Sequence, residues 1–145
     1  VRTAKAYNTY MPKDSPRTIL VDTFRDEAEE SLRVAEALGP DLAGIRLDTP
    51  HERGGGTEEL VMEVRARLDQ AGFSKVKIFA SGGLNPERMA KLAAAGVDAF
   101  GVGRFISSAA PIDMTMDIKE IEGVPVAKRG RIPGRVENPK TVRVS

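Results

Sequence analysis

The strongest constraint on this chain is a repeated unit in which a short apolar segment of strand type leads into a helical pattern or a glycine-rich turn. Gly39, Gly72 and Gly96 end three predicted helices, and Thr57 and Asn85 are placed to cap two of them. Strands that alternate with helices at this spacing predict an α/β fold with a parallel sheet. The strands are expected at residues 18–22, 42–47, 76–80 and 99–102.

Two successive strands end in glycine-rich turns. Glycines in such turns let backbone N–H groups approach an anion, and (β/α) barrels hold a phosphate in this way between late strands and a short helix. Either turn alone would be ordinary turn chemistry, whereas two in consecutive units predict a phosphorylated ligand. We therefore expect a partial (β/α) barrel of the TIM type, with an open doubly wound sheet as the alternative. The turns are Ser81, Gly82 and Gly83, and Gly101, Val102 and Gly103.

The chain is expected to contain two regions. Residues 1–110 form the partial barrel, and residues 111–145 form a small β appendage in which no further strand-helix unit follows. Within the appendage, residues 114–121 and 124–128 predict a β hairpin. The basic, proline-punctuated stretch at 129–140 predicts a loose tail.

The chain opens inside a predicted helix, Arg2–Tyr10, with no initiator Met and no capping residue, which suggests a portion of a longer protein. No apolar stretch approaches the roughly 20 residues that cross a bilayer. The first residues also lack the pattern of a signal peptide. We therefore expect a cytoplasmic chain without a membrane partner.

Composition excludes several classes of function. The chain has no cysteine, so disulfides, thiolate zinc sites and a cysteine nucleophile are all ruled out. Its formal net charge is +1, which produces no broad field toward nucleic acid. The short basic run at 128–131 lacks the interleaved aromatic residues that stack on bases. No nucleic-acid partner is expected.

Two aspartates, Asp22 and Asp48, lie where predicted strands end and loops begin. In a barrel, strand ends of this kind face the same mouth as the phosphate turns. Their carboxylates are able to bind ribose hydroxyls, hold magnesium or stabilise an oxocarbenium-like centre, although each alone could be a helix cap or turn former. They are the candidate catalytic and metal-binding residues.

Arg46 precedes Asp48 by two positions, which puts both side chains on one face of a strand. Because a buried arginine needs an anion, we expect Arg46 to pair with Asp48 or to bind a ligand carboxylate or phosphate. The glycine-rich loop at 49–56 is expected to be a flexible connector or a mobile loop over the site. Its His51, the one histidine of the chain, is expected to be incidental.

The segments around these residues keep an order and spacing that resemble the C-terminal part of the nicotinate phosphoribosyltransferases, within the type II nicotinate/quinolinate family. Quinolinate phosphoribosyltransferases share the fold and the Ser-Gly-Gly signature, while the Asp-Thr-Phe and Arg-Leu-Asp-Thr runs resemble the nicotinate branch more. The segments are Ile19–Phe24, Ile45–Thr49, Ile78–Leu84 and Phe100–Gly103, followed by Ser107-Ser108, Met116–Ile118 and Lys128–Gly130.

The resemblance implies a glycosyltransferase, also classed as a ligase, that makes nicotinate mononucleotide and pyrophosphate from nicotinate and phosphoribosyl pyrophosphate. This reaction belongs to pyridine nucleotide biosynthesis and supplies the salvage route to NAD. The resemblance also implies magnesium as cofactor and ATP as co-substrate. By resemblance, Asp22 and Asp48 flank the ribose and its magnesium-bound pyrophosphate, while the turns at 81–83 and 101–103 hold the 5′-phosphate.

The resemblance carries further expectations. Arg46 helps to place the ligand, and Arg104, where a smaller residue is expected, either clashes with the second turn or strengthens it. The family's histidine and its N-terminal domain lie upstream of the segment that starts here, so these residues alone are expected to be incomplete and inactive. Homo-oligomers that share active sites between subunits are also implied.

Three alternatives remain open at this point. The first is a quinolinate phosphoribosyltransferase, which releases carbon dioxide. The second is a noncatalytic phosphate-binding barrel fragment. The third is another barrel enzyme that acts on a sugar phosphate, such as an isomerase.

Overall fold

The computed structural model describes residues 1–140 and 142. The chain divides into two compact units, Val1–Ala109 and Ala110–Ser145, which are described separately below. Residues 141 and 143–145 of the expected appendage lie outside the described residues. Within the described part, no helix is long and apolar enough to span a bilayer.

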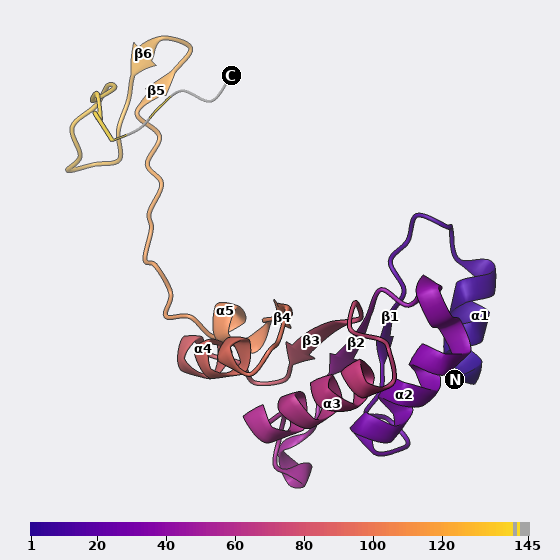
Figure 1. Cartoon of the computed structure of the whole chain (residues 1–145). Coiled ribbons are helices and arrows are strands. Elements are labelled where there is room, and N and C mark those ends of the chain that lie inside the picture. The colour runs from indigo at the N-terminus through magenta and orange to yellow at the C-terminus, as the bar shows by residue number, and fades with distance from the viewer. Residues whose placement is uncertain (141, 143–145) are drawn as a thin grey trace. The chain divides into compact units, whose positions relative to one another are not determined.

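The first unit alternates strands with helices along the whole of its length (Figure 1). The helix that opens the chain has the bounds expected from sequence, and each strand lies within two residues of its expected ends. The elements are α1 (Arg2–Tyr10), β1 (Thr18–Leu20), α2 (Glu27–Leu38), β2 (Gly44–Leu47), α3 (Glu58–Gln70), β3 (Lys77–Ser81), α4 (Pro86–Ala94), β4 (Ala99–Gly101) and α5 (Arg104–Ser107), with 3-10 turns η1 (Gly39–Asp41) and η2 (His51–Arg53).

Side chains at the helix starts explain where three of the helices begin. The Asp26 carboxylate accepts from the first backbone N–H groups of α2, and the Thr57 hydroxyl accepts from Leu60 N in α3. The Asn85 amide oxygen accepts from Arg88 N, and Pro86 follows as the first residue of α4. The predicted caps at Thr57 and Asn85 are therefore confirmed.

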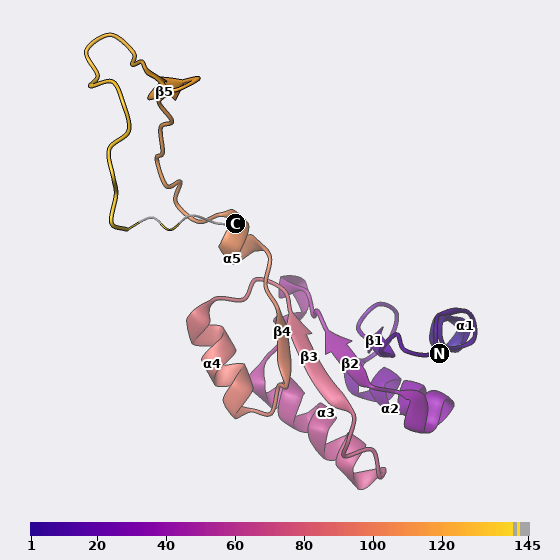
Figure 2. The same cartoon turned by 90° about the horizontal axis from the view of Figure 1, so that it is seen from above.

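The four strands form one parallel sheet in the order β1-β2-β3-β4. A doubly wound sheet would reverse its strand order, whereas here every strand pairs with its predecessor in the chain. Consecutive helices also pack side by side, α1 on α2, α2 on α3 and α3 on α4. Figure 2 shows α2 and α3 along one face of the sheet. This is the arrangement of a (β/α)-barrel segment, so the predicted partial barrel is confirmed.

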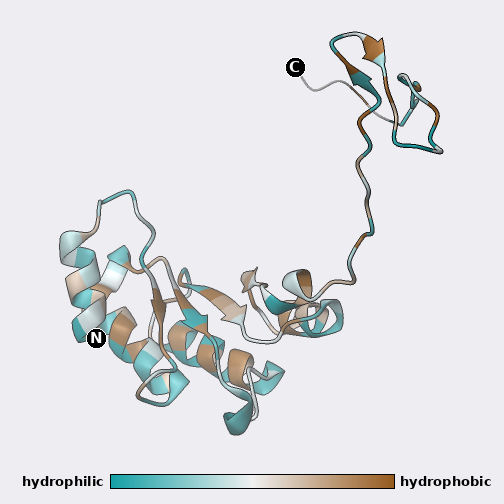
Figure 3. Ribbon diagram, turned by 180° about the vertical axis from the view of Figure 1, so that it is seen from behind, coloured by the Kyte–Doolittle hydropathy of each residue, from teal (hydrophilic) through white to brown (hydrophobic). Residues whose placement is uncertain are grey.

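The core lies between the sheet and these helices. Ile45 of β2 and Ile78 of β3 are fully buried, as are Val34 of α2 and Val64 and Leu68 of α3. Figure 3 shows that the strands and the sheet-facing parts of these helices are hydrophobic, with polar residues on the outer surface. Burying these side chains supplies the main stabilisation of the unit.

Among the described residues of the first unit, no helix covers the opposite face of the sheet (Figure 2). Because side chains alternate along a strand, residues next to buried Ile45 and Leu47 point to this face. The register sets Leu20 of β1, Arg46 of β2 and Phe79 of β3 side by side there. The Arg46 side chain pairs with Asp48, one of the two partners expected for it, and it is 50% exposed. The reason is that no other layer of the described residues covers this face.

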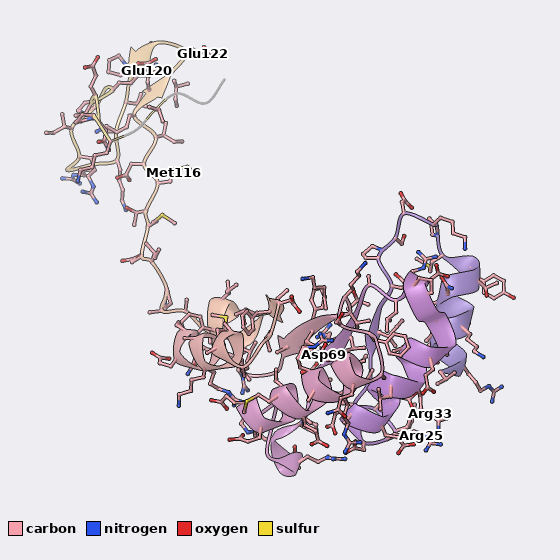
Figure 4. All side chains as sticks on the ribbon, in the orientation of Figure 1. Arg25, Arg33, Asp69, Met116, Glu120 and Glu122 are labelled. Atoms are coloured by element: carbon pink, nitrogen blue, oxygen red, sulfur yellow. The ribbon has the colours of Figure 1, made fainter. Side chains whose placement is uncertain are left out.

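The second unit contains a small antiparallel hairpin of β5 (Glu120–Ile121) and β6 (Val124–Pro125). Glu122 and Gly123 both have positive φ, 49° and 80°, which is the type I′ geometry that suits a two-residue hairpin turn. The hairpin itself is confirmed, but the expected strands at 114–121 and 124–128 were too long. Met116 lies in an extended segment before β5 (Figure 4), where it is almost fully exposed and pairs with no strand.

The start of β3 is tied to the start of β4 by Asp98. Its carboxylate accepts from Lys77 Nζ (2.8 Å) and from the backbone N–H of Ile78 (2.8 Å). Burial pushes the pKa of Asp98 upward, but the hydrogen bonds from Lys77 and Ile78 and the charges of Lys77 and Arg65 outweigh it, so the pKa lies below its ordinary value.

Stability should therefore depend on pH through Asp98. A carboxyl whose pKa is depressed on folding stabilises the fold above its unfolded pKa, about 4, and this stabilisation is lost as pH falls through the lower folded pKa. We expect Asp98→Asn to cost about 1 kcal/mol at pH 7, and the difference from wild type to shrink below about pH 4. Urea unfolding of both proteins at pH 7 and below about pH 4 measures this difference. If the difference in unfolding free energy did not change with pH, the Asp98 carboxylate would not be the source of the stabilisation.

Candidate functional site

The carboxyl ends of the four strands meet at one edge of the sheet. Leu20, Arg46 and Phe79 lie side by side in the register, and Ser81 pairs with Gly101. Two residues further along each strand, the same face carries Asp22, Asp48 and Ser81. Asp22 and Asp48, which follow β1 and β2, therefore lie in one row with Ser81 and Gly101, the last residues of β3 and β4.

Hydrogen bonds connect the two aspartates. The backbone N–H of Asp48 donates to Asp22 Oδ2 (2.5 Å), so the loop after β1 is joined to the loop after β2. Asp48 Oδ2 in turn pairs with Arg46 Nη2 at 3.3 Å, which confirms that these two side chains share a face. The aspartates and Arg46 thus form one contiguous charged group.

Arg46 extends this group to the next strand. Its Nε donates to Ser81 Oγ at 2.9 Å, and the Ser81 hydroxyl is close enough to donate to the backbone oxygen of Leu47 at 3.3 Å. Ser81 is buried, whereas Arg46 and Asp48 are partly open to solvent. An exposed ion pair of this kind contributes little to stability, so Arg46 remains available to a ligand anion.

The first glycine turn is packed against Asp48. Gly82 and Gly83 have φ of 93° and 60°, a region that other residues adopt only with strain. A Cβ on Gly82 would lie 2.8 Å from Asp48 Oδ1. Gly82 is therefore favoured by its backbone angle, and a Cβ at this position would displace the Asp48 carboxylate beside it. The following helix α4 directs its amino end toward this turn.

Of the second glycine turn, only Gly101 lies in the row beside Ser81. A Cβ on Gly101 would lie 3.2 Å from Ser81 Cβ, so the two turns start side by side. Val102 instead packs against the hydrophobic core. Gly103 has open space around it and precedes α5, a helix of 4 residues that the sequence did not predict. Arg104 is exposed, with no ion pair in the described part of the chain.

Three further residues at this edge were not singled out as functional by the sequence. His51 was expected to be incidental, yet its Nε2 lies 3.7 Å from the position of a Cβ on Gly83. Glu27 of α2 and Arg88 of α4 hydrogen-bond the loop that carries His51. No local pattern could have signalled these contacts, because they depend on β2 lying between β1 and β3 in the sheet.

The arrangement suits a ligand that combines phosphate with hydroxyl or cation-binding groups. Backbone N–H groups of the glycine turns and the Arg46 guanidinium bind anions, and the aspartates accept hydroxyl hydrogen bonds or hold a cation. Among residues 1–140 and 142, no group of three or more His, Cys, Asp or Glu side chains could hold a metal ion alone. Magnesium commonly needs only one or two carboxylates together with substrate phosphates, so the pair fits that role.

The comparison with protein families decides where this chain belongs. Residues 2–117 match the family described as quinolinate phosphoribosyl transferase, C-terminal domain. The chain belongs to this family. The matched segment includes every residue of the row and both glycine turns. The predicted membership of the nicotinate/quinolinate phosphoribosyltransferase family is thereby confirmed.

Individual members of the family resemble the chain as well. It is 34% identical over 115 residues to nicotinate phosphoribosyltransferase pncB1 of Mycobacterium tuberculosis, covering 77% of this chain and 24% of that protein. It is 38% identical over 114 residues to pncB2 of the same organism, covering 72% and 24%. The chain thus spans about a quarter of the length of these curated relatives.

A solved structure of a family member shares the fold. It is the crystal structure of nicotinate-nucleotide pyrophosphorylase from Pyrococcus furiosus, which superposes with a TM-score of 0.75 at 47% sequence identity. The match covers 93% of this chain and 34% of that one. Both the sequence relatives and this structure are therefore considerably longer than the segment described here.

Proposed function

We propose that this chain carries the phosphoribosyl-binding site of a phosphoribosyltransferase that forms nicotinate mononucleotide and pyrophosphate from nicotinate and phosphoribosyl pyrophosphate, in NAD salvage. The observation that carries the proposal is the row in which Asp22, Asp48 and Ser81 meet next to two glycine turns. A phosphorylated sugar needs both kinds of group at one edge, because its phosphate is anionic and its hydroxyls are hydrogen-bond donors.

The proposed roles follow from the positions of the residues. The turn at Ser81, Gly82 and Gly83, with backbone groups of Gly101, Val102 and Gly103, binds the 5′-phosphate, and Arg104 adds a positive charge beside it. Asp22 and Asp48 face the ribose hydroxyls and the bond that breaks. Both roles use groups that the fold fixes before the ligand arrives, which reduces the cost of ordering them.

The chemical step is a displacement at the anomeric carbon of the ribose. The bond from this carbon to a pyrophosphate oxygen breaks, the oxygen keeps the electron pair, and the pyridine nitrogen of nicotinate forms the new bond. Positive charge develops on the ribose as the bond breaks, and the carboxylates of Asp22 and Asp48 stabilise it. Magnesium, held by these carboxylates with the pyrophosphate oxygens, would neutralise charge on the leaving group.

Nicotinate is the substrate that we favour. The curated relatives at 34% and 38% identity are named nicotinate phosphoribosyltransferases, and Arg46 offers one guanidinium to a ligand with one carboxylate.

Coupling to ATP hydrolysis is part of the proposal by resemblance to this branch. The unpaired edges that β1 and β4 present among the described residues also favour a homo-oligomer.

Quinolinate is the second candidate substrate. It is supported by the name of the matched family, which covers residues 2–117. The two substrates differ in outcome, because quinolinate loses a carboxyl group as carbon dioxide when the mononucleotide forms. Labelled carbon dioxide from carboxyl-labelled quinolinate therefore distinguishes the two reactions.

The proposal is tested first by binding and then by product formation. We expect titration calorimetry to show that the purified chain binds phosphoribosyl pyrophosphate in the presence of Mg²⁺, and less tightly without it. In a full-length version that contains this segment, chromatography should show nicotinate mononucleotide when nicotinate is added, with ADP formed when ATP is present. Absence of phosphoribosyl pyrophosphate binding would overturn the proposal in favour of another sugar-phosphate enzyme. Binding without product from either pyridine in that full-length version would favour a noncatalytic phosphate-binding domain.

A further inference from the structure

Glu27 is a buried carboxylate that none of the proposed chemical steps uses. It is the first residue of α2, and only 2% of it is exposed. An acidic residue in the first turn of a helix is usually solvated, and burying its charge is costly unless it is well paired. Among the described residues no buried side-chain nitrogen or oxygen lacks a hydrogen-bond partner. The partners of Glu27 therefore explain why it is tolerated.

Both partners of the Glu27 side chain come from the loop that follows β2. Thr49 Oγ1 donates to Glu27 Oε1 at 3.1 Å, and Arg53 Nη2 donates to Oε2 at 3.3 Å. Thr49 is itself buried, and it directly follows Asp48 in the chain. One carboxylate of α2 thus holds the residue next to the candidate catalytic aspartate and, through Arg53, the 3-10 turn that follows.

The carboxyl-terminal end of the same loop, at Gly56, is held by helix α4. Arg88 Nη2 of α4 donates to the backbone oxygen of Gly56 at 2.9 Å. Between the two anchors, backbone hydrogen bonds from Arg53 and Gly55 to the oxygen of Pro50 close the turn η2. The loop at 49–56, which the sequence predicted to be flexible, is therefore fastened at both ends and hydrogen-bonded in the middle.

We propose that Glu27 is a positioning residue for the ligand site. It orders the loop at 49–56 so that Asp48 stays against Gly82 and His51 stays beside Gly83 before ligand binds. Among the described residues, the Glu27 side chain accepts hydrogen bonds from Thr49 and Arg53 and from neither Asp48 nor His51, so it acts through Thr49 and Arg53. The identity of the ligand rests on the proposed function above, whereas the ordering of the loop does not.

The test compares Glu27→Gln, Arg53→Gln and the double variant with wild type. Glutamine keeps the shape of Glu27 and its bond from Thr49 but removes the ion pair. Glu63→Gln is the matched control, because Glu63 pairs with Arg67 at 2.6 Å on α3 and both side chains are about half exposed. Three quantities are measured for each variant: hydrogen exchange of residues 49–56, the melting temperature, and the Kd for phosphoribosyl pyrophosphate with Mg²⁺. The Kd is measured at a temperature where every variant is folded.

We expect Glu27→Gln to speed exchange in the loop and to raise the Kd roughly tenfold, with Arg53→Gln acting in the same direction. The double variant should show the same loop exchange and the same Kd as Glu27→Gln alone, because both single substitutions remove the same ion pair between Glu27 and Arg53. Glu63→Gln should leave loop exchange and Kd unchanged. A lower melting temperature with unchanged loop exchange and Kd would overturn the positioning role. If Glu27→Gln does not fold, loop exchange and Kd in Arg53→Gln test the positioning role instead. Arg53 is the exposed partner of the ion pair, so its substitution disturbs the core less.

Failure of the proposed function is distinguishable from failure of this inference. If wild type does not bind phosphoribosyl pyrophosphate, the proposed function falls. Loop exchange in Glu27→Gln and Arg53→Gln then still decides whether Glu27 orders the loop: faster exchange confined to residues 49–56 supports it, and unchanged exchange overturns it.

Discussion

Replacing Gly82 by alanine is expected to raise the Kd for phosphoribosyl pyrophosphate by at least about 100-fold, because the change acts on the turn and on Asp48 together. The φ of Gly82 is 93°, where a residue with a Cβ is strained by about 1–2 kcal/mol. The added methyl group would also lie 2.8 Å from Asp48 Oδ1, well inside contact distance. Either the turn or the carboxylate must move.

The chain offers a matched control for Gly82→Ala. Gly72, at the end of α3, has a similar φ of 86°, but nothing lies within 4 Å of where its Cβ would be. Gly72→Ala should therefore cost about 1–2 kcal/mol in urea unfolding and leave the Kd unchanged. Calorimetry and urea unfolding on both variants measure this. If Gly82→Ala lost stability as Gly72→Ala does but bound ligand normally, the turn would not be a phosphate site.

In a full-length version that contains this segment, Asp48→Asn is expected to lower the rate of nicotinate mononucleotide formation by about 100-fold or more, the effect typical of removing one group that stabilises developing charge. Asparagine keeps the size of the side chain and the backbone N–H that donates to Asp22. What is lost is the negative charge beside the breaking bond and opposite Arg46. Because stabilisation of the transition state is lost, kcat should fall more than KM rises.

A second aspartate serves as the control for this variant. Asp69 on α3 pairs with Arg65 at 2.8 Å and is about as exposed as Asp48, but it lies in the last turn of a helix rather than at a strand end. Asp69→Asn should change neither rate nor ligand affinity. If Asp48→Asn and Asp69→Asn both turned over at the wild-type rate, Asp48 would have no catalytic role.

The amino-acid sequence determined the parts of the structure that depend on neighbouring residues. The helix at Arg2–Tyr10, the caps Thr57 and Asn85 and the glycine turn at Ser81–Gly83 were all predictable, because each is fixed by interactions within a few residues. Repeated strand-helix units likewise predicted the parallel sheet. Family membership followed from short runs of residues at the same strand ends.

The tertiary structure alone decided which residues surround the candidate site and how exposed they are. Arg46 was expected to pair with Asp48 or a ligand anion, but its exposure followed only from the tertiary structure: it is half exposed because the described chain places helices on only one face of the sheet. His51 had no visible role until the pairing of β2 with β3 placed it beside Gly83. Glu27 reads in the sequence as an ordinary acid at a helix start, and only the neighbouring loop gives it partners. Contacts of this kind join separate strand-helix units, so local sequence patterns carry no signal for them.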